Sequence, residues 1–347
     1  MEPGLGKTVT ALTIIEESPK GATLVIAPKR VAESVWAQEC ANWKHLSSMK
    51  VGKIMGSPSQ RLKVLQSSLD VYVINVENVT WLIDNWIDNK FQYLIVDESS
   101  RFKDPSTKRF KALKKVLKQF QRRIILTGTP TPQGYADLWA QVGLLDLGER
   151  LETSITRFRE KYMYVAEKNR HTGVVYKWAL NTGADKLINS RISDICFSLL
   201  AEDYLELPSL SNLYHRISFD NDIRAKYNAL KKHMVAEIGT EEITAPTAAT
   251  LTNKLLQFTS GAIYTESQEV VHIHDTKLEF LESLLEESSA PTLLFYHFKH
   301  SLQRILDKFP EAVILSDDNN LQCRDGKIKL LVAHPQSGGI GLNLQCN

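Results

Sequence analysis

The chain has 347 residues, of which 43% are hydrophobic, and a formal net charge of +2. That length and hydrophobic content exceed what a single small domain needs and favour two buried cores. Because the net charge is so low, a polyanionic partner has to be bound by local basic patches rather than by the overall field.

The cysteines and the apolar runs exclude several other classes of protein. The cysteines are widely spaced and include no Cys-x-x-Cys pair, which argues against a zinc site or a disulfide framework and favours a reduced, intracellular setting. The chain lacks an apolar run of about 18 residues and has no signal-peptide pattern, so we expect a soluble protein without a targeting signal. The cysteines are Cys40, Cys196, Cys323 and Cys346.

The first 147 residues alternate short apolar runs with amphipathic stretches. This pattern is typical of βαβ units around a parallel sheet, so the predicted fold class is α/β. The helix at 105–120 is expected to begin with Asp104 as its N-cap and Pro105 at its first position. Strands are predicted at 23–27, 71–75, 93–96 and 123–126, and helices at 9–15, 31–43, 78–89 and 105–120.

The remaining sequence divides into a charged stretch and a second alternating region. Residues 151–208 read as mainly helical and charged, with a polar, glycine-containing interruption near 171–183, and are interpreted as an insertion. Beyond them, helices are predicted at 221–238, 250–260 and 277–287, and strands at 292–296 and 328–333.

Near the start of the chain, Gly4-Leu5-Gly6-Lys7-Thr8 has the composition of a phosphate-binding loop. In such a loop the glycines expose backbone N–H groups to phosphates, the lysine reaches the β and γ oxygens, and the threonine hydroxyl coordinates Mg²⁺. The alternative is a glycine-bearing turn that caps an ordinary helix.

Two further segments place polar residues directly after apolar strands. Asp97 and Glu98 follow one strand, where Asp97 would hold Mg²⁺ and Glu98 would polarise an attacking water; a solvated acidic turn is the alternative. Thr127, Gly128 and Thr129 follow the next strand and could sense the γ-phosphate, although they also suit an ordinary Gly-Pro turn. Both segments are expected at the same edge of the sheet.

A glycine-rich loop follows the strand predicted at 328–333. It runs from Gln336 to Gln345 and combines three glycines with polar side chains, an arrangement that suits a phosphodiester or a nucleotide edge. A surface loop without a ligand is the alternative.

The order of MEPGLGKT, LVIAPKRVAESVWAQECANW, YLIVDESSRFKD, ILTGTPTPQGYADLW and SGGIGLNLQ resembles motifs I, Ia, II, III and V of superfamily 2 helicase-like ATPases, specifically the SNF2-like branch. The compact second half is similar to small bacterial and bacteriophage members. The resemblance implies two RecA-like P-loop lobes with parallel sheets, at 1–150 and 209–347, joined by the helical insertion at 151–208. It also implies ATP and Mg²⁺ as cofactors, double-stranded DNA as partner, no membrane, and a cytoplasmic setting in a bacterial or bacteriophage-infected cell.

Site residues follow from the resemblance one by one. Lys7, Thr8, Asp97 and Glu98 match hydrolytic positions, and Pro28 and Lys29 match a segment that contacts the DNA backbone. A second DNA-contacting loop is matched by Gln336, Ser337, Gly338 and Gly339, and positions near the nucleotide and the interlobe cleft are matched by Gly341, Asn343 and Gln345.

The chain departs from the family pattern in motif II and at its ends. Family members usually carry Asp-Glu-x-His in motif II, whereas the fourth position here is Ser100, so a coupling hydrogen bond from histidine must be weaker or replaced. The chain ends before motif VI with its arginine fingers, and no strand precedes the phosphate-binding loop. We therefore expect a piece truncated at both ends, weakly active alone, with the strands that end at Val96 and Leu126 left partly unpaired.

Some conspicuous residues receive a structural interpretation. Trp36 and Trp43 are expected in the core, and His272 and His274 are expected to be structural because no further ligand lies at metal spacing. Residues 101–123 contain ten Lys or Arg against one acid. DNA contact and a solvated helix face remain open for this cluster, with Arg101 and Lys103 as the candidates for DNA contact.

The function predicted from the sequence is an ATP-dependent motor that moves along double-stranded DNA. A strand-separating helicase or the motor of a restriction system is the alternative among enzymes, although no separating pin or nuclease domain is recognisable. A non-catalytic, ATP-gated DNA-binding module is the alternative of another class.

Overall fold

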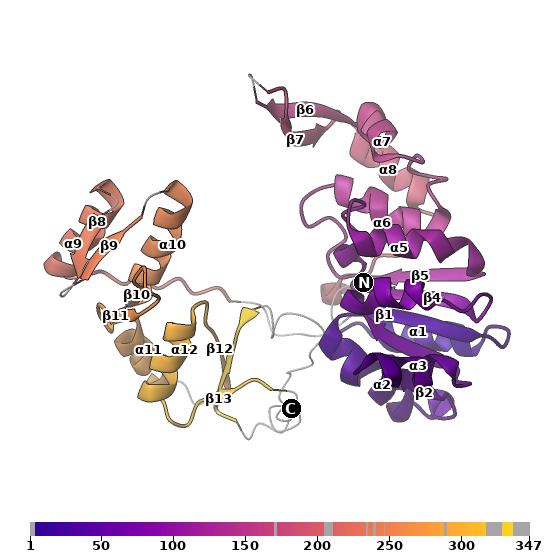
Figure 1. The fold of residues 1–347 in the computed structure, drawn as a ribbon, viewed down its shortest axis with the longest axis horizontal. Coiled ribbons are helices and arrows are strands. Elements are labelled where there is room, and N and C mark those ends of the chain that lie inside the picture. Colours follow the sequence, from indigo (N-terminus) through magenta and orange to yellow (C-terminus); the bar gives the residue numbers. More distant parts are fainter. Residues whose placement is uncertain are drawn as a thin grey trace. The chain divides into compact units, whose positions relative to one another are not determined.

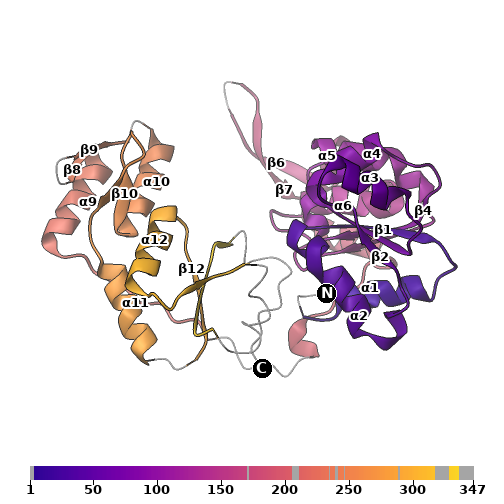
Figure 2. The same ribbon diagram turned by 60° about the horizontal axis from the view of Figure 1, so that its bottom comes forward.

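A computed structural model describes residues 4–169, 172–204, 211–233, 235–238, 241–245, 247–287, 290–316 and 328–335. The chain divides into two compact units, Met1–Pro208 (unit 1) and Ser209–Asn347 (unit 2). The elements of each are labelled in Figure 1, and Figure 2 shows them after a rotation. Among the helices in the described ranges, none combines the length and the apolar character of a membrane span.

Unit 1 is built on a five-stranded parallel sheet with the strand order β2-β3-β1-β4-β5. Strands β1, β3 and β4 are almost entirely buried, which is why they appear in the sequence as continuous apolar runs. The four strands predicted for this half of the chain are present. Their bounds are β1 Ala22–Ala27, β2 Val51–Lys53, β3 Val71–Asn75, β4 Phe91–Asp97 and β5 Arg122–Leu126.

Helices cover both faces of this sheet, and successive strand residues alternate between two cores. On β4, Leu94 and Val96 belong to one cluster together with side chains of α4, α5 and α6. Ile95 belongs to the other cluster, with side chains of α1 and α2. The helices of unit 1 are α1 Lys7–Glu16, α2 Trp36–Asn42, α3 Pro58–Gln66, α4 Val79–Asp84, α5 Lys108–Val116, α6 Ala136–Asp146, α7 Ile155–Tyr162 and α8 Ala184–Ile192.

Several helix boundaries differ from the predictions. The helix predicted at 31–43 begins with a π-helical turn, Val31–Val35, before α2, and the one predicted at 78–89 ends at Asp84. Helix α5 begins later than predicted because Thr107 is its N-cap, whereas the Asp104 carboxylate accepts hydrogen bonds from the backbone and hydroxyl of Ser106 in the preceding turn. Local capping bonds of this kind compete closely at helix starts.

The expectation for the tryptophans holds for one of the two. Trp36 is fully buried. Trp43 is 46% exposed and donates from its ring nitrogen to the Glu39 carboxylate at 2.9 Å, so its expected place in the core is wrong. It is the C-cap of α2 and has an extended backbone conformation.

The pairing of the central strands also corrects an expectation. β4 is hydrogen-bonded to β1 on one side and to β5 on the other, so the strand that ends near Val96 is fully paired. β5 has β4 as its only partner among the described strands and forms an edge of the sheet. Its residues Ile124, Ile125 and Leu126 are only partly buried.

The stretch at 151–208 contains an antiparallel hairpin that the sequence analysis did not predict. Strands β6, Met163–Lys168, and β7, Val175–Leu180, lie between α7 and α8. Both views show the pair extending away from the body of unit 1 (Figures 1 and 2). The sequence hides it because most side chains on β6 are exposed, so no apolar alternation marks the strand.

Unit 2 contains a three-stranded parallel sheet with the order β12-β14-β13, and smaller antiparallel pairs. The helix predicted at 221–238 ends at His233, and a strand follows it. The elements are α9 Asn221–His233, β8 Val235–Ile238, β9 Glu241–Thr244, α10 Ala248–Thr259, β10 Ala262–Tyr264, β11 Val270–His272, α11 Thr276–Glu287, β12 Thr292–Phe295, α12 Lys299–Lys308, β13 Val313–Ile314 and β14 Leu330–Ala333.

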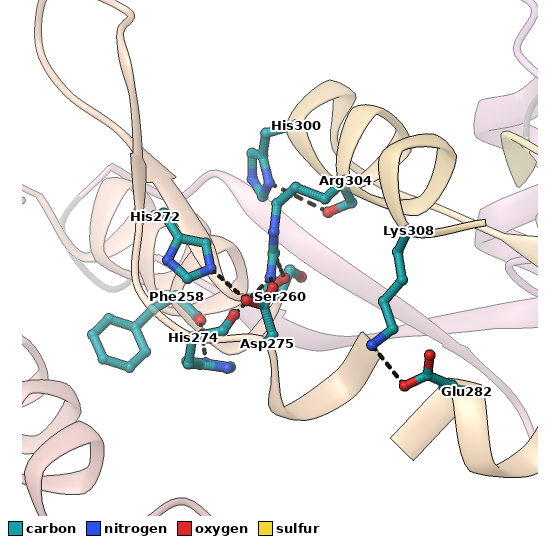
Figure 3. A network of polar contacts seen from close by, with 10 residues as sticks. Phe258, Ser260, His272, His274, Asp275, Glu282, His300, Arg304 and Lys308 are labelled. Atoms are coloured by element: carbon teal, nitrogen blue, oxygen red, sulfur yellow. Dashed lines mark hydrogen bonds and ion pairs between the residues drawn. The ribbon is translucent and has the colours of Figure 1, made fainter. Parts of the chain in front are cut away.

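One arginine connects separate elements of unit 2 (Figure 3). The Arg304 guanidinium on α12 donates to the backbone carbonyl of Ser260 at 2.5 Å, to that of His274 at 2.6 Å and to the Asp275 carboxylate at 2.6 Å. Gly261 has φ +92°, and a Cβ there would lie 2.6 Å from the guanidinium nitrogens, so the approach requires glycine. Arg304 therefore holds α12 against the segment that joins α10 to α11.

The two buried histidines beside Arg304 make the stability of unit 2 dependent on pH. Burial and the Arg304 charge lower the pKa of His300 to about 4, and burial also lowers the pKa of His274. The unfolded chain binds protons at these histidines more readily than the folded chain does. The free energy of unfolding therefore includes a contribution from the two histidines above the unfolded pKa of about 6.5, and this contribution is lost as the pH falls toward 4.

We expect the urea midpoint of unit 2 to fall between pH 6.5 and pH 4.5, and to fall less in His300→Phe, which cannot take up the proton. All six tryptophans lie in unit 1, so circular dichroism follows both units while tryptophan fluorescence follows unit 1 alone. His215→Phe, at an exposed histidine of unit 2, is the matched control. An identical pH dependence in His300→Phe and the wild type would contradict the assignment.

Candidate nucleotide-binding site

The candidate site lies at the carboxyl edge of the unit 1 sheet. Ile26 of β1 is aligned with Val96 of β4, and Asp97 is aligned with Leu126 of β5. Because the three strands are parallel, the segments that follow them leave the sheet at the same edge. This alignment brings the Asp97-Glu98 turn beside the segment that starts at Thr127.

The predicted phosphate-binding loop leads directly into α1, which begins at Lys7. Gly4 has φ 84° and Gly6 has φ 68°, in the left-handed region that favours glycine. A Cβ on Gly6 would also lie 3.3 Å from the Val9 side chain. The first turn of α1 carries no acidic residue, so its backbone N–H groups and the helix dipole favour an anion.

The Asp97 carboxylate is oriented by two hydrogen bonds at the end of β4. The Trp36 ring nitrogen donates to Oδ2 at 3.3 Å, and the Glu98 backbone N–H donates to Oδ1 at 3.0 Å. Burial raises the pKa of Asp97 to about 6, while these two hydrogen bonds and the charge of Lys7 lower it. Lys7 and Asp97 therefore lie near enough for their charges to interact.

Glu98 adopts a left-handed backbone conformation with φ 51°, which turns the chain sharply after the strand. Its side-chain oxygen Oε1 accepts hydrogen bonds from the Ser100 hydroxyl and, at 3.1 Å, from the Thr127 hydroxyl. Thr127 Oγ1 in turn accepts from the Thr129 backbone N–H at 3.0 Å. The carboxylate is therefore fixed from both predicted segments.

A second, fully buried link joins these segments, and the sequence analysis missed it. The Ser99 hydroxyl donates to Gln141 Oε1 at 2.7 Å, and the Gln141 amide donates to the Pro130 carbonyl at 2.7 Å. Gln141 lies on α6, and its exposed fraction is 1%. Ser100, at the position where family members usually carry histidine, donates to Glu98 instead, while the Ser99–Gln141 pair joins the turn after β4 to α6.

The residues predicted to contact DNA are only partly in the described chain. Pro28 follows β1 and is buried, and the Lys29 side chain is 68% exposed. Arg101 and Lys103 each form an ion pair, with Glu77 at 3.5 Å and Asp137 at 3.6 Å. The remaining predicted positions lie outside the described residues: Gln336, Ser337, Gly338, Gly339, Gly341, Asn343 and Gln345.

No group of three or more His, Cys, Asp or Glu side chains that could hold a metal occurs within the described ranges. His272 contacts the Asp275 carboxylate at 3.0 Å, and His274 Nε2 lies 3.0 Å from the Phe258 carbonyl. Both rings are therefore engaged in hydrogen bonds within unit 2. The structural interpretation of these histidines agrees with those contacts.

A glycine loop that opens a helix beside an acidic strand end, on a parallel sheet covered by helices, defines a P-loop nucleotide-binding protein. The family model described as SNF2-related domain matches residues 1–260. The chain belongs to this SNF2-related family of helicase-type proteins, as its motif order indicated.

The chain is also similar to individual proteins. The putative protein p41 of Acyrthosiphon pisum secondary endosymbiont phage 1 is 37% identical, over 99% of this chain and 77% of its own length. A Xenopus tropicalis SWI/SNF-related regulator of chromatin, subfamily A-like protein 1, is 25% identical over 88% of this chain and 30% of its own length. The Sulfolobus solfataricus SWI2/SNF2 ATPase core in complex with dsDNA is 21% identical over 96% of this chain and 72% of its own, with a TM-score of 0.48.

We expect Gln141→Ala to lower the free energy of unfolding of unit 1 by about 1–3 kcal/mol, because the Ser99 hydroxyl and the Pro130 carbonyl lose a buried partner. Urea unfolding followed by tryptophan fluorescence measures this. Ser99→Ala supplies the second arm of a double-mutant cycle, in which the two substitutions should be clearly non-additive. Additive effects would contradict a direct Ser99–Gln141 link.

Proposed function

We propose that this chain is an ATP-dependent motor that hydrolyses ATP at the unit 1 site and moves along double-stranded DNA. The observation that carries the proposal is that the Lys7 loop, Asp97 and Glu98 lie at the same edge of the sheet. The proposed organisation is two RecA-like lobes, 1–150 and 209–347, with an insertion at 151–208. The proposed setting is the cytoplasm of a bacterial or bacteriophage-infected cell.

The residues of the loop have the chemistry that triphosphate binding needs. Lys7 supplies a cation, and Gly4 and Gly6 have the positive φ angles of a loop whose backbone N–H groups can bind an anion. The Thr8 hydroxyl and the oriented Asp97 carboxylate are oxygen donors of the kind that Mg²⁺ prefers, so this donor set fits the ion. Bound Mg²⁺ would neutralise charge on the phosphates.

Glu98 is the proposed base that orients the attacking water and accepts its proton. Both hydroxyls that hold Glu98 donate to Oε1, and Oε2 accepts no hydrogen bond from the described residues. The second oxygen is therefore available to a water. Because Thr127 contacts Glu98 directly, loss of the γ-phosphate would be transmitted to residues 127–130, in agreement with the proposed coupling role of Thr127, Gly128 and Thr129.

The names of the relatives support nucleic acid as the substrate of the motor. They include the helicase ssl-1 of Caenorhabditis elegans and the ISWI chromatin-remodeling complex ATPase ISW1 of Saccharomyces cerevisiae. Pro28, Lys29 and the glycine loop at 336–339 are the proposed DNA contacts, with Arg101 and Lys103 beside them. Gly341, Asn343 and Gln345 are proposed to act near the nucleotide.

We expect Glu98→Gln to retain ATP binding but to lower the rate of phosphate release by roughly 10²–10⁴-fold, because the base is lost. Lys7→Ala should lose ATP binding, and chelation of Mg²⁺ should stop hydrolysis by the wild type. A fluorescent ATP analogue and a phosphate sensor make the measurements, with Lys20→Ala, at an exposed lysine of unit 1, as the control. Wild-type turnover by Glu98→Gln would overturn the role of Glu98.

The hairpin β6–β7 gives one specific observation in favour of a second candidate, a strand-separating helicase, since such enzymes need a projecting pin. Triplex displacement distinguishes the candidates: we expect displacement of a third strand from intact duplex, dependent on ATP and lost in Glu98→Gln. Unwinding of a forked substrate without triplex displacement would favour the helicase. ATP-dependent changes in DNA affinity without hydrolysis would favour the ATP-gated binding module.

A further inference from the structure

The hairpin formed by β6 and β7 extends from unit 1 (Figures 1 and 2). Most of its side chains are exposed to solvent. Its base is anchored, because Met163 is buried and Trp178 and Leu180 pack against the main core of unit 1. The Arg159 guanidinium from α7 lies 5.2 Å from the centre of the Trp178 ring. The base therefore has a fixed attachment to α7.

Beyond its base the hairpin has little to bury. Tyr164 is 54% exposed and Tyr176 is 66% exposed, although large aromatic side chains usually pack against something. The strand register shifts on either side of Glu167, so the ladder is irregular and its twist is increased. A lone two-stranded hairpin is only marginally stable in water, so binding to a partner would stabilise the conformation of a hairpin of this kind.

The charges of the hairpin and of α7 are predominantly positive. In the described part of residues 155–180, five side chains are Lys or Arg and two are Glu, whereas the whole chain carries only +2. Lys168 and Lys177 are exposed on the strands, and Arg157 is exposed on α7. Lys177 lies 3.4 Å from Glu167, but both side chains are 64% exposed, so this pair contributes little.

We propose that the β6–β7 hairpin is an additional DNA-binding element that contacts the phosphate backbone of duplex DNA through Lys168 and Lys177. This rests on the proposed function, because it takes DNA as the partner of the motor. A two-stranded ribbon has the width of the major groove, lysines bind phosphates, and tyrosine hydroxyls donate to phosphate oxygens. Tyr164 and Tyr176 are the exposed tyrosines of the described hairpin.

Phosphate contacts of this kind are independent of base sequence. They suit a motor that has to pass over any sequence, and they act through counterion release. The exposed lysines disfavour a protein partner at the same ribbon, since lysine is depleted from the cores of protein interfaces. The hairpin would thus add a duplex contact to the one proposed at residues 28–29.

The test compares Lys168→Gln/Lys177→Gln with the wild type for binding of a fluorescein-labelled duplex at several salt concentrations. We expect the slope of log affinity against log salt to become shallower by about 0.9 for each phosphate contact removed, and the Kd to rise roughly tenfold at moderate salt. Binding of the ATP analogue and the circular dichroism spectrum should not change, since the P-loop lies outside the hairpin.

Lys53→Gln/Lys63→Gln removes two exposed lysines, on β2 and α3 at an edge of the five-stranded sheet of unit 1, and is the matched control. It should leave both the slope and the Kd unchanged. If the wild type binds the duplex but Lys168→Gln/Lys177→Gln binds it equally well, or if the control variant weakens binding as much, the hairpin proposal is overturned and the proposed function stands. Absence of duplex binding by the wild type would overturn both.

Discussion

The parallel alignment of β1, β4 and β5 is the constraint on which the candidate site depends. Pairing of Asp97 with Leu126 fixes where two separate loops leave the sheet, and it brings the Glu98 carboxylate within 3.1 Å of the Thr127 hydroxyl. Neither loop could hold this geometry alone, because the hydrogen bond joins side chains that follow two different strands. The hydrogen-bonded pairing of these apolar strands therefore brings two short polar segments together in one site.

The same strand arrangement places the Asp97 carboxylate both beside the buried core and in the candidate site. The carboxylate lies where a fully buried tryptophan of one core can reach it, so desolvation raises its pKa while the indole N–H and Lys7 oppose that effect. The two hydrogen bonds, from Trp36 and from the Glu98 backbone, hold this carboxylate in one orientation. That suits a group whose proposed partner is a cation bound with the nucleotide.

The sequence was sufficient where a local pattern carries the information. Strands β1, β3, β4 and β5 are marked by continuous apolar runs, and the positions of Asp97 and Glu98 follow from the end of a strand. The Ser99–Gln141 bond could not be predicted, because the packing of α6 decides which side chain meets Ser99 from 42 positions away. The hairpin was missed for the opposite reason: its exposed strands have no buried face to impose an alternating pattern.

The partly exposed strand β5 has a consequence for how the chain behaves in concentrated solution. Among the described strands, β5 has a partner on one side only, and an apolar strand of this kind is a template for pairing with another molecule. Arg122 is exposed and lies just before the apolar residues Ile124 to Leu126, and a charged residue that flanks such a run acts as a gatekeeper against assembly. Arg123 is partly buried and donates to the Leu145 carbonyl at 2.7 Å, so the exposed charge of Arg122 is the one that opposes assembly.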